Sequence, residues 1–292
     1  LLKAFALNAA TGDELWRFDP NVGAAAQRGL MWWEREGEAR LFYAAGSTLL
    51  AVNPDDGTPV RSFGNNGRLD LTPRGDRTGY IGVTVPGVVF EDTLILGFST
   101  TEGTDAFPGS IRAFSALDGS LTWQFDTIPA PNTPGSETWA NGALASAGGA
   151  NVWTGMTLDE ERGLLYAPTG SATPDFYGAN RLGDNLYANS VVALDARTGE
   201  RRWHYQVWRH DIWDRDFPSP PTLVQLERDG VVIDAVAVTT KSGHLWVFER
   251  DTGEPLYDVI EEETLPSTLP GEAPAPTQPV SESSLGTSLL PP

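Results

Sequence analysis

Residues 191–205 read VVALDARTGERRWHY and hold the strongest indication of how this chain folds. An alternating apolar run leads into a polar turn that ends in Gly199, and a second run carries Trp203. Alternation with a period of two is typical of strands, and a glycine that closes a short turn accepts positive φ at low cost. The pattern therefore predicts a β-hairpin whose second strand presents a large aromatic side chain.

The same pattern recurs along the chain, with two clear copies and two degenerate ones. They are AFALNAATGDELWRF at 4–18, RAFSALDGSLTWQF at 112–125, LLAVNPDDGTPVRSF at 49–63 and LWVFERDTGEPLYDV at 245–259. A plain propeller blade takes roughly 40–50 residues, so the intervals between copies suit four-stranded blades with long insertions. The five signatures predict an all-β chain folded as a β-propeller, with each aromatic filling the gap between adjacent sheets. Unrelated hairpins in a sandwich, the alternative, would not require a Trp at one offset after a turn glycine.

Composition excludes several classes of protein. The 292 residues include 39 acidic and 20 basic side chains, which gives a formal charge of −19. A nucleic-acid surface needs clustered positive charge, so nucleic acid is not an expected partner. The chain has no Cys, which excludes disulfides and thiolate metal sites.

The C-terminal part of the sequence has a different composition. After Arg250 there are eight acidic residues and no Lys or Arg, and seven prolines follow from Pro266 onward. We expect residues 1–260 to form a partial propeller and residues 261–292 to be an acidic, Pro-rich loop or a truncated segment that pairs poorly in a sheet. Five signatures without a closing partner indicate a fragment of a larger propeller.

The repeat A-x-D/N-x-x-T-G-x-x-x-W resembles the tryptophan-docking motif of the quinoprotein dehydrogenases, which use pyrroloquinoline quinone (PQQ). The likeness covers residues 1 to about 280 and is nearest to the quinoprotein glucose dehydrogenase branch. It includes the strings GYIGVTVPGVV, GLLYAPTGSATPDFYGANR, WRHDIWDRDFPSPPTL and TTKSGHLWVFERDTG. The resemblance implies an eight-bladed propeller, of which this chain would supply rather more than half.

Residues 208–218, WRHDIWDRDFP, place three carboxylates among two tryptophans. Aspartates beside aromatic rings can be partly desolvated, which favours a base or a metal ligand. The alternative is that Asp211, Asp214 and Asp216 all cap turns. The resemblance implies that Asp214 is the catalytic base.

The resemblance also implies a set of cofactor-binding residues. Lys241 interrupts the run AVAVTTKSGHLWVF, where a charge needs a partner unless it faces outward, and it would hydrogen-bond the quinone oxygens. Trp153, in a Gly-rich stretch outside the docking offset, would stack on the quinone. Arg28 would pair with a cofactor carboxylate, and Thr84 and Ser99 would donate hydroxyl hydrogen bonds.

The expected metal site is hard and oxygen-liganded, which favours Ca²⁺, with Mg²⁺ as the alternative. By resemblance, Glu102 and Asp214 are ligands, and either Ser171 or Thr173 is the third. Two features depart from the family. The adjacent Cys pair that covers the second quinone face in many alcohol-oxidising members is absent, and residues 21–30 lack the His often found in glucose dehydrogenases.

The resemblance therefore implies a periplasmic PQQ-dependent dehydrogenase that oxidises a glucose-like sugar or a primary alcohol. Electrons would pass to ubiquinone or a cytochrome, and any anchor in the inner membrane would lie outside this chain. The alternative is a non-catalytic propeller that serves as a protein-binding scaffold. An enzyme, unlike a scaffold, should gather five residues around one hollow near the propeller axis, namely Arg28, Glu102, Trp153, Asp214 and Lys241.

Overall fold

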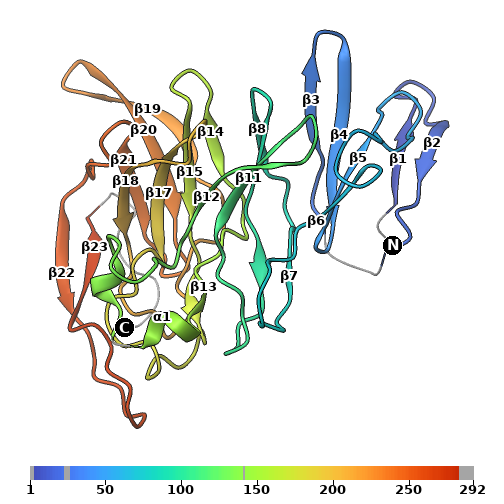
Figure 1. The fold of residues 1–292 in the computed structure, drawn as a ribbon. Helices are drawn as coiled ribbons and strands as arrows, with labels where there is room; N and C mark the ends of the chain where they lie inside the picture. Colours follow the sequence, from blue (N-terminus) through green and yellow to red (C-terminus); the bar gives the residue numbers. More distant parts are fainter. Residues whose placement is uncertain (1–2, 23–26, 141, 283–292) are drawn as a thin grey trace.

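The computed structural model describes residues 3–22, 27–140 and 142–282, and most of its regular structure is antiparallel sheet (Figure 1). Three sheets have four strands each. The first is β3 (Met31–Arg35), β4 (Glu38–Ala45), β5 (Thr48–Val52) and β6 (Arg68–Asp70). The second is β8 (Val88–Phe90), β9 (Thr93–Leu96), β11 (Ile111–Ser115) and β12 (Leu121–Phe125). The third is β14 (Thr157–Asp159), β15 (Leu164–Pro168), β17 (Ser190–Asp195) and β18 (Arg201–Gln206).

Smaller sheets flank these three. A three-stranded sheet contains β19 (Thr222–Arg228), β20 (Val231–Thr239) and β21 (Leu245–Glu249). Two-stranded pairs are β1 (Ala4–Leu7) with β2 (Glu14–Phe18), and β22 (Val259–Glu263) with β23 (Thr277–Ser281). The sheets stand side by side in sequence order, as blades of a propeller do (Figure 1). The predicted all-β propeller architecture is confirmed.

The core lies between adjacent sheets, because strand residues alternate between two buried faces. Leu94 packs in the cluster between the first and second four-stranded sheets, whereas its neighbour Ile95 packs in the cluster between the second and third. Leu165 and Tyr166 divide in the same way between the two faces of the third sheet. Each inner strand is therefore apolar on both sides, as a stacked array of sheets requires.

The repeat motif joins one sheet to the next. The Trp203 indole Nε1 donates to the Arg250 carbonyl at 2.8 Å, and a Cβ added at Gly253 would lie 2.4 Å from the ring. Gly253 has φ +73, so only glycine satisfies both the turn and the contact. The same contact is made by Trp16 on Gly57, Phe63 on Gly119 and Trp123 on Gly199. The aromatic of each motif fills the gap to the next motif's turn, as predicted.

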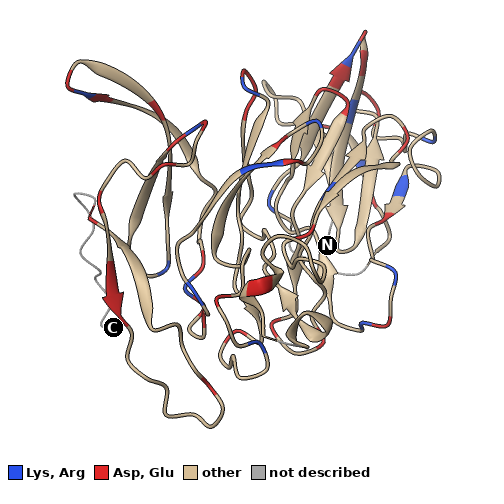
Figure 2. Cartoon of the chain, turned by 60° about the vertical axis from the view of Figure 1, so that its left-hand side comes forward, with Lys and Arg blue, Asp and Glu red and all other residues tan. Residues whose placement is uncertain are grey.

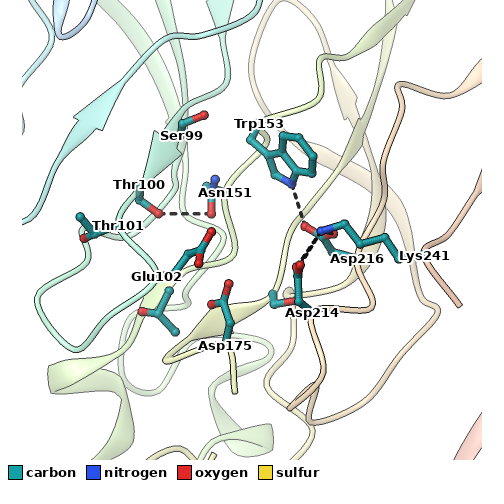
Figure 3. A pocket seen from close by; sticks show the side chains of 12 residues that line it. Ser99, Thr100, Thr101, Glu102, Asn151, Trp153, Asp175, Asp214, Asp216 and Lys241 are labelled. Atoms are coloured by element: carbon teal, nitrogen blue, oxygen red, sulfur yellow. Dashed lines mark hydrogen bonds and ion pairs between the residues drawn. The ribbon is translucent and has the colours of Figure 1, made fainter. Parts of the chain in front are cut away.

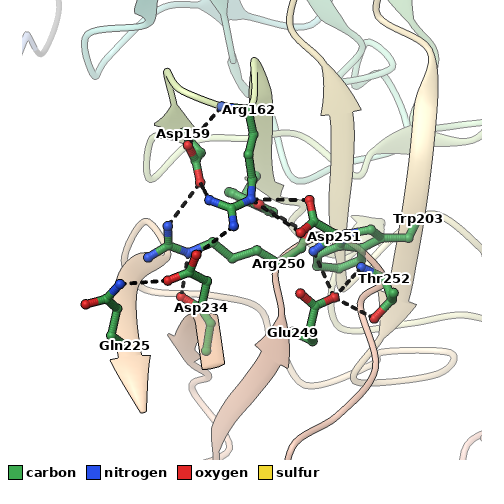
Figure 4. Close-up of polar contacts among 11 residues, drawn as sticks. Asp159, Arg162, Trp203, Gln225, Asp234, Glu249, Arg250, Asp251 and Thr252 are labelled. Carbon is green, nitrogen blue, oxygen red and sulfur yellow. Dashed lines mark hydrogen bonds and ion pairs between the residues drawn. The ribbon is translucent and has the colours of Figure 1, made fainter. Parts of the chain in front are cut away.

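An ion-pair network reinforces the junction between the third sheet and the three-stranded sheet (Figure 4). Arg162 contacts Asp159 at 3.1 Å, Asp234 at 2.6 Å and Asp251 at 3.3 Å. Arg250 reaches the same Asp159 carboxylate at 3.0 Å. Because Asp159 is buried and lies between two guanidinium groups, its charge is compensated from both sheets.

The acidic, Pro-rich tail, which begins at residue 261, contains more paired β-strand than expected. Residues 261–263 belong to β22 and pair with β23, and in the part of the tail that the structure describes the segment between these strands is a loop. Pro279 is accommodated because β23 is an edge strand, where a missing N–H leaves no ladder bond broken. Three of the eight acidic residues that follow Arg250 fall on β22, which is largely red in Figure 2. Residues 283–292 lie outside the described residues, and the division at residue 260 stays a prediction.

Short elements complete the fold and lead to the site. β7 (Ile81–Gly82) pairs with β10 (Ser99–Thr100), and β13 (Gly148–Gly149) pairs with β16 (Ala172–Thr173). The helical turns are η1 (Ser136–Thr138) and α1 (Ala143–Ser146). In the described part of the chain, no helix has the length and apolar character needed to cross a bilayer.

Candidate active site

A polar cavity of about 240 Å³ lies where loops of several sheets converge (Figure 3). Its walls come from β10 and the loop after it, the segment after β13, the region of β16, the loop between β18 and β19, and the turn after β20. The lining residues are Ser99, Thr100, Thr101, Glu102, Asn151, Trp153, Ser171, Thr173, Asp175, Asp214, Asp216 and Lys241. Four carboxylates and one ammonium group therefore face one small volume.

Lys241 is held between two aspartates. Its Nζ lies 2.7 and 2.8 Å from the two carboxylate oxygens of Asp214 and 2.6 Å from Oδ1 of Asp216. The sequence suggested a strand through this position, but β20 ends at Thr239 and Lys241 lies in the turn before β21. Burial alone would lower the pKa of Lys241, yet the contacts with both carboxylates outweigh burial and raise it. The side chain is therefore a paired cation directed at the cavity.

Trp153 occupies the wall beside this cluster (Figure 3). Its indole Nε1 donates to Oδ2 of Asp216 at 2.7 Å, and Lys241 Nζ lies 5.0 Å from the centre of its ring. Asp216 is only 3% exposed. Burial raises the pKa of Asp216 to about 6, although the hydrogen bonds from Lys241 and Trp153 act in the opposite direction. Asp216 thus accepts a hydrogen bond from the indole and forms an ion pair with the ammonium group.

Asp214 stands on a strained loop that Asp211 supports. Asp214 has φ +54, a left-handed conformation that few non-glycine residues adopt. Asp211 accepts the backbone N–H of Trp213 on one oxygen, at 3.0 Å, and that of Arg215 on the other, at 2.6 Å. Asp211 is buried and also accepts from Ser171 Oγ at 2.5 Å. Of the three carboxylates in this segment, Asp211 alone caps the turn, while Asp214 and Asp216 line the cavity.

The opposite wall is rich in oxygen atoms. Glu102 and Asp175 face the cavity together with Thr173 (Figure 3 labels the two acids). Burial and the charges of Glu102, Asp214 and Asp211 raise the pKa of Asp175 to about 8. Thr173 Oγ1 and Asp175 Oδ1 are buried without a hydrogen-bond partner, so both oxygens are available to a ligand. Within the described residues, no three acidic or imidazole groups already form a compact metal-binding cluster.

Arg28, Thr84 and Ser99 form a chain of contacts at the edge of the site. Arg28 Nη1 lies 3.4 Å from Thr84 Oγ1, and Thr84 Oγ1 lies 2.8 Å from Ser99 Oγ. Ser99 lines the cavity, but Thr84 and Arg28 do not. Arg28 is exposed and reaches the cavity only through these two hydroxyls.

The structure brings most of the predicted residues together. Glu102, Trp153, Asp214 and Lys241 line one cavity, as do Ser99, Ser171 and Thr173. No site role was predicted from sequence for four other lining residues, Thr100, Thr101, Asn151 and Asp175, and Asp216 was indicated only as one of the three carboxylates of residues 208–218. Asp216 belongs to the WDRD string and Asp175 follows Thr-Pro, but neither string says which way its carboxylate points.

A family model matches nearly the whole chain. The family model for the PQQ-type glucose/ethanol/alcohol dehydrogenase β-propeller domain matches residues 2–289. Quinoprotein glucose dehydrogenase A of Acinetobacter calcoaceticus is 32% identical, with 96% of this chain and 39% of that protein covered. Quinate/shikimate dehydrogenase (quinone) of Acinetobacter baylyi is also 32% identical, with 94% of this chain and 38% of that protein covered.

A solved structure gives the same fold. Quinohemoprotein alcohol dehydrogenase from Comamonas testosteroni superposes with a TM-score of 0.77 at 24% identity, over 97% of this chain and 43% of that one. The chain thus spans about two fifths of the length of the curated relatives it matches.

Proposed function

The chain belongs to the glucose/ethanol/alcohol dehydrogenase β-propeller family of PQQ-dependent quinoproteins, and we propose that it carries the reacting residues of a dehydrogenase acting on a sugar or a primary alcohol. One observation carries this proposal. Glu102, Trp153, Asp214 and Lys241 come from separate stretches of the sequence, yet they line one cavity. The docking contacts alone give no reason for these four side chains to converge.

The cavity fits the cofactors that the family implies. Trp153 supplies an aromatic wall for a planar ring system, and Lys241 supplies a cation beside it. The oxygen-rich wall suits a hard divalent cation, since Ca²⁺ and Mg²⁺ take carboxylate and hydroxyl oxygens. Because the pKa of Asp175 is raised to about 8, this group is mostly protonated at neutral pH, but the three other carboxylates still outnumber the one ammonium group, and a cation would balance the excess. PQQ and Ca²⁺ are therefore our proposed ligands, with Mg²⁺ as the alternative cation.

We assign the third metal ligand to Thr173 rather than Ser171. The Thr173 hydroxyl is buried without a partner, whereas Ser171 already hydrogen-bonds Asp211. Glu102 and Asp214 would supply the two carboxylates. On this assignment Thr173→Val should weaken Ca²⁺ binding about tenfold or more, and Ser171→Ala should weaken it less. The opposite order in a calcium titration would move the ligand to Ser171.

The residues divide the chemistry between them. When bound, PQQ would supply the hydride acceptor and the cation would supply Lewis-acid polarisation. Asp214 takes the proton of the substrate hydroxyl as general base, because it is a carboxylate at the cavity wall. Lys241 places positive charge where negative charge develops, and Trp153 offers a ring against which a flat group can stack. Arg28, through Thr84 and Ser99, would anchor a carboxylate at the edge of the site.

Substrate, electron acceptor and location are further parts of the proposal. A relative named for glucose is among the most similar proteins, so we propose an aldose as substrate, with a primary alcohol as the alternative. A relative named for quinate has the same sequence identity, so quinate belongs among the substrates tested. Ubiquinone or a cytochrome would accept the electrons, in the periplasm.

The test uses the full-length protein, reconstituted with PQQ and Ca²⁺ and assayed by dye reduction with glucose, quinate and short alcohols. We expect turnover of at least one substrate, and we expect Asp214→Asn to lower kcat by about 10²–10⁴-fold, the usual range for a lost general base. Asp229→Asn, in the exposed turn between β19 and β20, is the matched control. A fully active Asp214→Asn enzyme, or a reconstituted protein without quinone absorbance, would overturn the proposal.

A further inference from the structure

Asp216 has contacts that the proposed chemistry does not explain. It is 3% exposed, and both carboxylate oxygens are engaged from opposite sides. Oδ2 accepts the indole N–H of Trp153 at 2.7 Å, and Oδ1 lies 2.6 Å from the ammonium group of Lys241 (Figure 3). Burying a carboxylate costs folding free energy unless its partners compensate the charge. The position of Asp216 between these two side chains therefore indicates a role beyond stability.

From these contacts we propose that Asp216 is a positioning residue: it fixes the Trp153 ring and the Lys241 ammonium group in the cavity through its two oxygens. The inference rests on the proposed function, in which Trp153 stacks on the cofactor and Lys241 places positive charge beside it. An indole donates only through Nε1 at the ring edge, so a fixed acceptor there restricts rotation of the ring plane. The face that Trp153 turns to the cavity thus depends on Asp216.

Lys241 depends on Asp216 in a second way. Its ammonium group contacts Asp214, the proposed base, on one side. Asp216 forms a second ion pair with Lys241, and the backbone N–H of Lys241 also donates to the Asp216 carbonyl at 2.8 Å. The position of the cation in the cavity is therefore set by Asp216 as well as by Asp214.

The surroundings hold Asp216 in place. A Cβ added at Gly170 would lie 3.0 Å from Asp216 Oδ2 and 3.5 Å from the Trp153 ring, so the carboxylate and the indole leave little free space there. An amide cannot replace this carboxylate. Asn carries one acceptor and one NH₂ group, so in either orientation the NH₂ faces a donor, either the indole or the ammonium group.

The experiment measures PQQ affinity by equilibrium titration, and kcat at saturating PQQ, for the full-length calcium-loaded protein. We expect Asp216→Asn to weaken PQQ binding and to lower kcat, each by roughly 10- to 100-fold, with substrate KM changed less. Asp216→Glu keeps both acceptor oxygens and should recover a large part of each loss. Asp229→Asn is again the control and should change neither quantity.

Trp153→Phe separates the two contacts, because Phe keeps a ring but has no N–H to donate. In that background the Asp216→Asn change should weaken PQQ binding less than it does in the wild type, because only the contact with Lys241 remains to be lost, and it should still lower kcat. If Asp216→Asn does not fold, Trp153→Phe alone tests the indole contact, and wild-type PQQ affinity in that variant would contradict the inference.

Two results would overturn the inference. They are wild-type PQQ affinity and kcat in Asp216→Asn, and an equal loss of affinity with and without the Trp153 indole. Either result leaves the proposed function standing as long as Asp214→Asn is inactive. An active Asp214→Asn enzyme would instead overturn the function itself.

Discussion

Trp203 and Trp153 are the same residue type in two regions with different requirements. The Trp203 indole donates to the carbonyl of Arg250 and packs on Gly253, a contact that recurs between successive sheets. The Trp153 indole donates to the carboxylate of Asp216, 63 positions away. A backbone carbonyl is supplied by any residue, whereas a carboxylate is supplied only by Asp or Glu. The indole contact between sheets therefore sets no requirement on the side chain of the accepting residue, whereas the indole contact in the cavity requires an acidic side chain.

The two regions also differ in how charge is handled. In the ion-pair network of Arg162, Arg250 and their aspartates, the buried Asp159 carboxylate meets two guanidinium groups (Figure 4). In the cavity, four carboxyl groups face a single ammonium group, which contacts Asp214 and Asp216 (Figure 3). Charge that is already compensated stabilises a junction between sheets, while uncompensated charge is suited to binding a ligand.

The largest expected effect concerns the docking contact. Trp203→Ala should lower the free energy of unfolding by about 3–5 kcal/mol, because a buried indole leaves a cavity between two sheets. Trp32→Ala on β3 is the control, since Trp32 is 52% exposed whereas Trp203 is 6% exposed. Urea denaturation measures both. Equal losses in the two variants would mean that docking does not hold the sheets together.

A smaller loss is expected in the ion-pair network. Asp159→Ala should cost about 1–3 kcal/mol, because Arg250 is mostly buried and keeps only backbone carbonyls as acceptors. Asp251→Ala removes a mainly exposed partner of Arg162 and should cost less than about 1 kcal/mol. The same denaturation experiment compares them, and a larger loss for Asp251→Ala would contradict the assignment of burial.

The smallest effect is a pH dependence of stability. Burial, together with the charge of Arg201, lowers the pKa of His204 to about 4, below the usual value near 6.5 in an unfolded chain. Between these values the unfolded chain binds the proton and the folded protein does not, so stability falls as pH falls from about 6.5 to about 4. His204→Gln should reduce this slope.

Denaturation midpoints of both proteins across pH 4–8 test the effect, with the interval from pH 7 to 8 as an internal control. A stability difference between wild type and His204→Gln that stays constant through pH 4–6.5 would contradict the lowered pKa.

The framework could be predicted from sequence because its contacts are local and repeated. A turn glycine and an aromatic at a fixed offset are visible in each motif, as with Gly199 and Trp203. Because the motif is repeated, a degenerate copy could also be identified: Phe63 packs on Gly119 although that copy has no Trp. The tail offered no such repetition, and the pairing of β22 with β23 was missed because neither VIEEE nor TQPVS alternates between apolar and polar residues.

The cavity could be predicted only in part. Resemblance to a family identified Asp214, Lys241, Trp153 and Glu102 one at a time, but it did not say which of them touch. Asp216 shows the limit, because its function follows from contacts with residues on other loops. No local pattern near the WDRD string specifies such contacts, which depend on how the sheets bring the loops together.

The most direct test of the account is a crystal structure of the full-length protein loaded with PQQ and Ca²⁺, with anomalous data to locate the cation. The account predicts planar density against Trp153 with Lys241 and Asp214 at its edge, and a calcium peak bound by Glu102, Asp214 and Thr173. A quinone bound away from Trp153, or a calcium ion that contacts neither Glu102 nor Asp214, would contradict it.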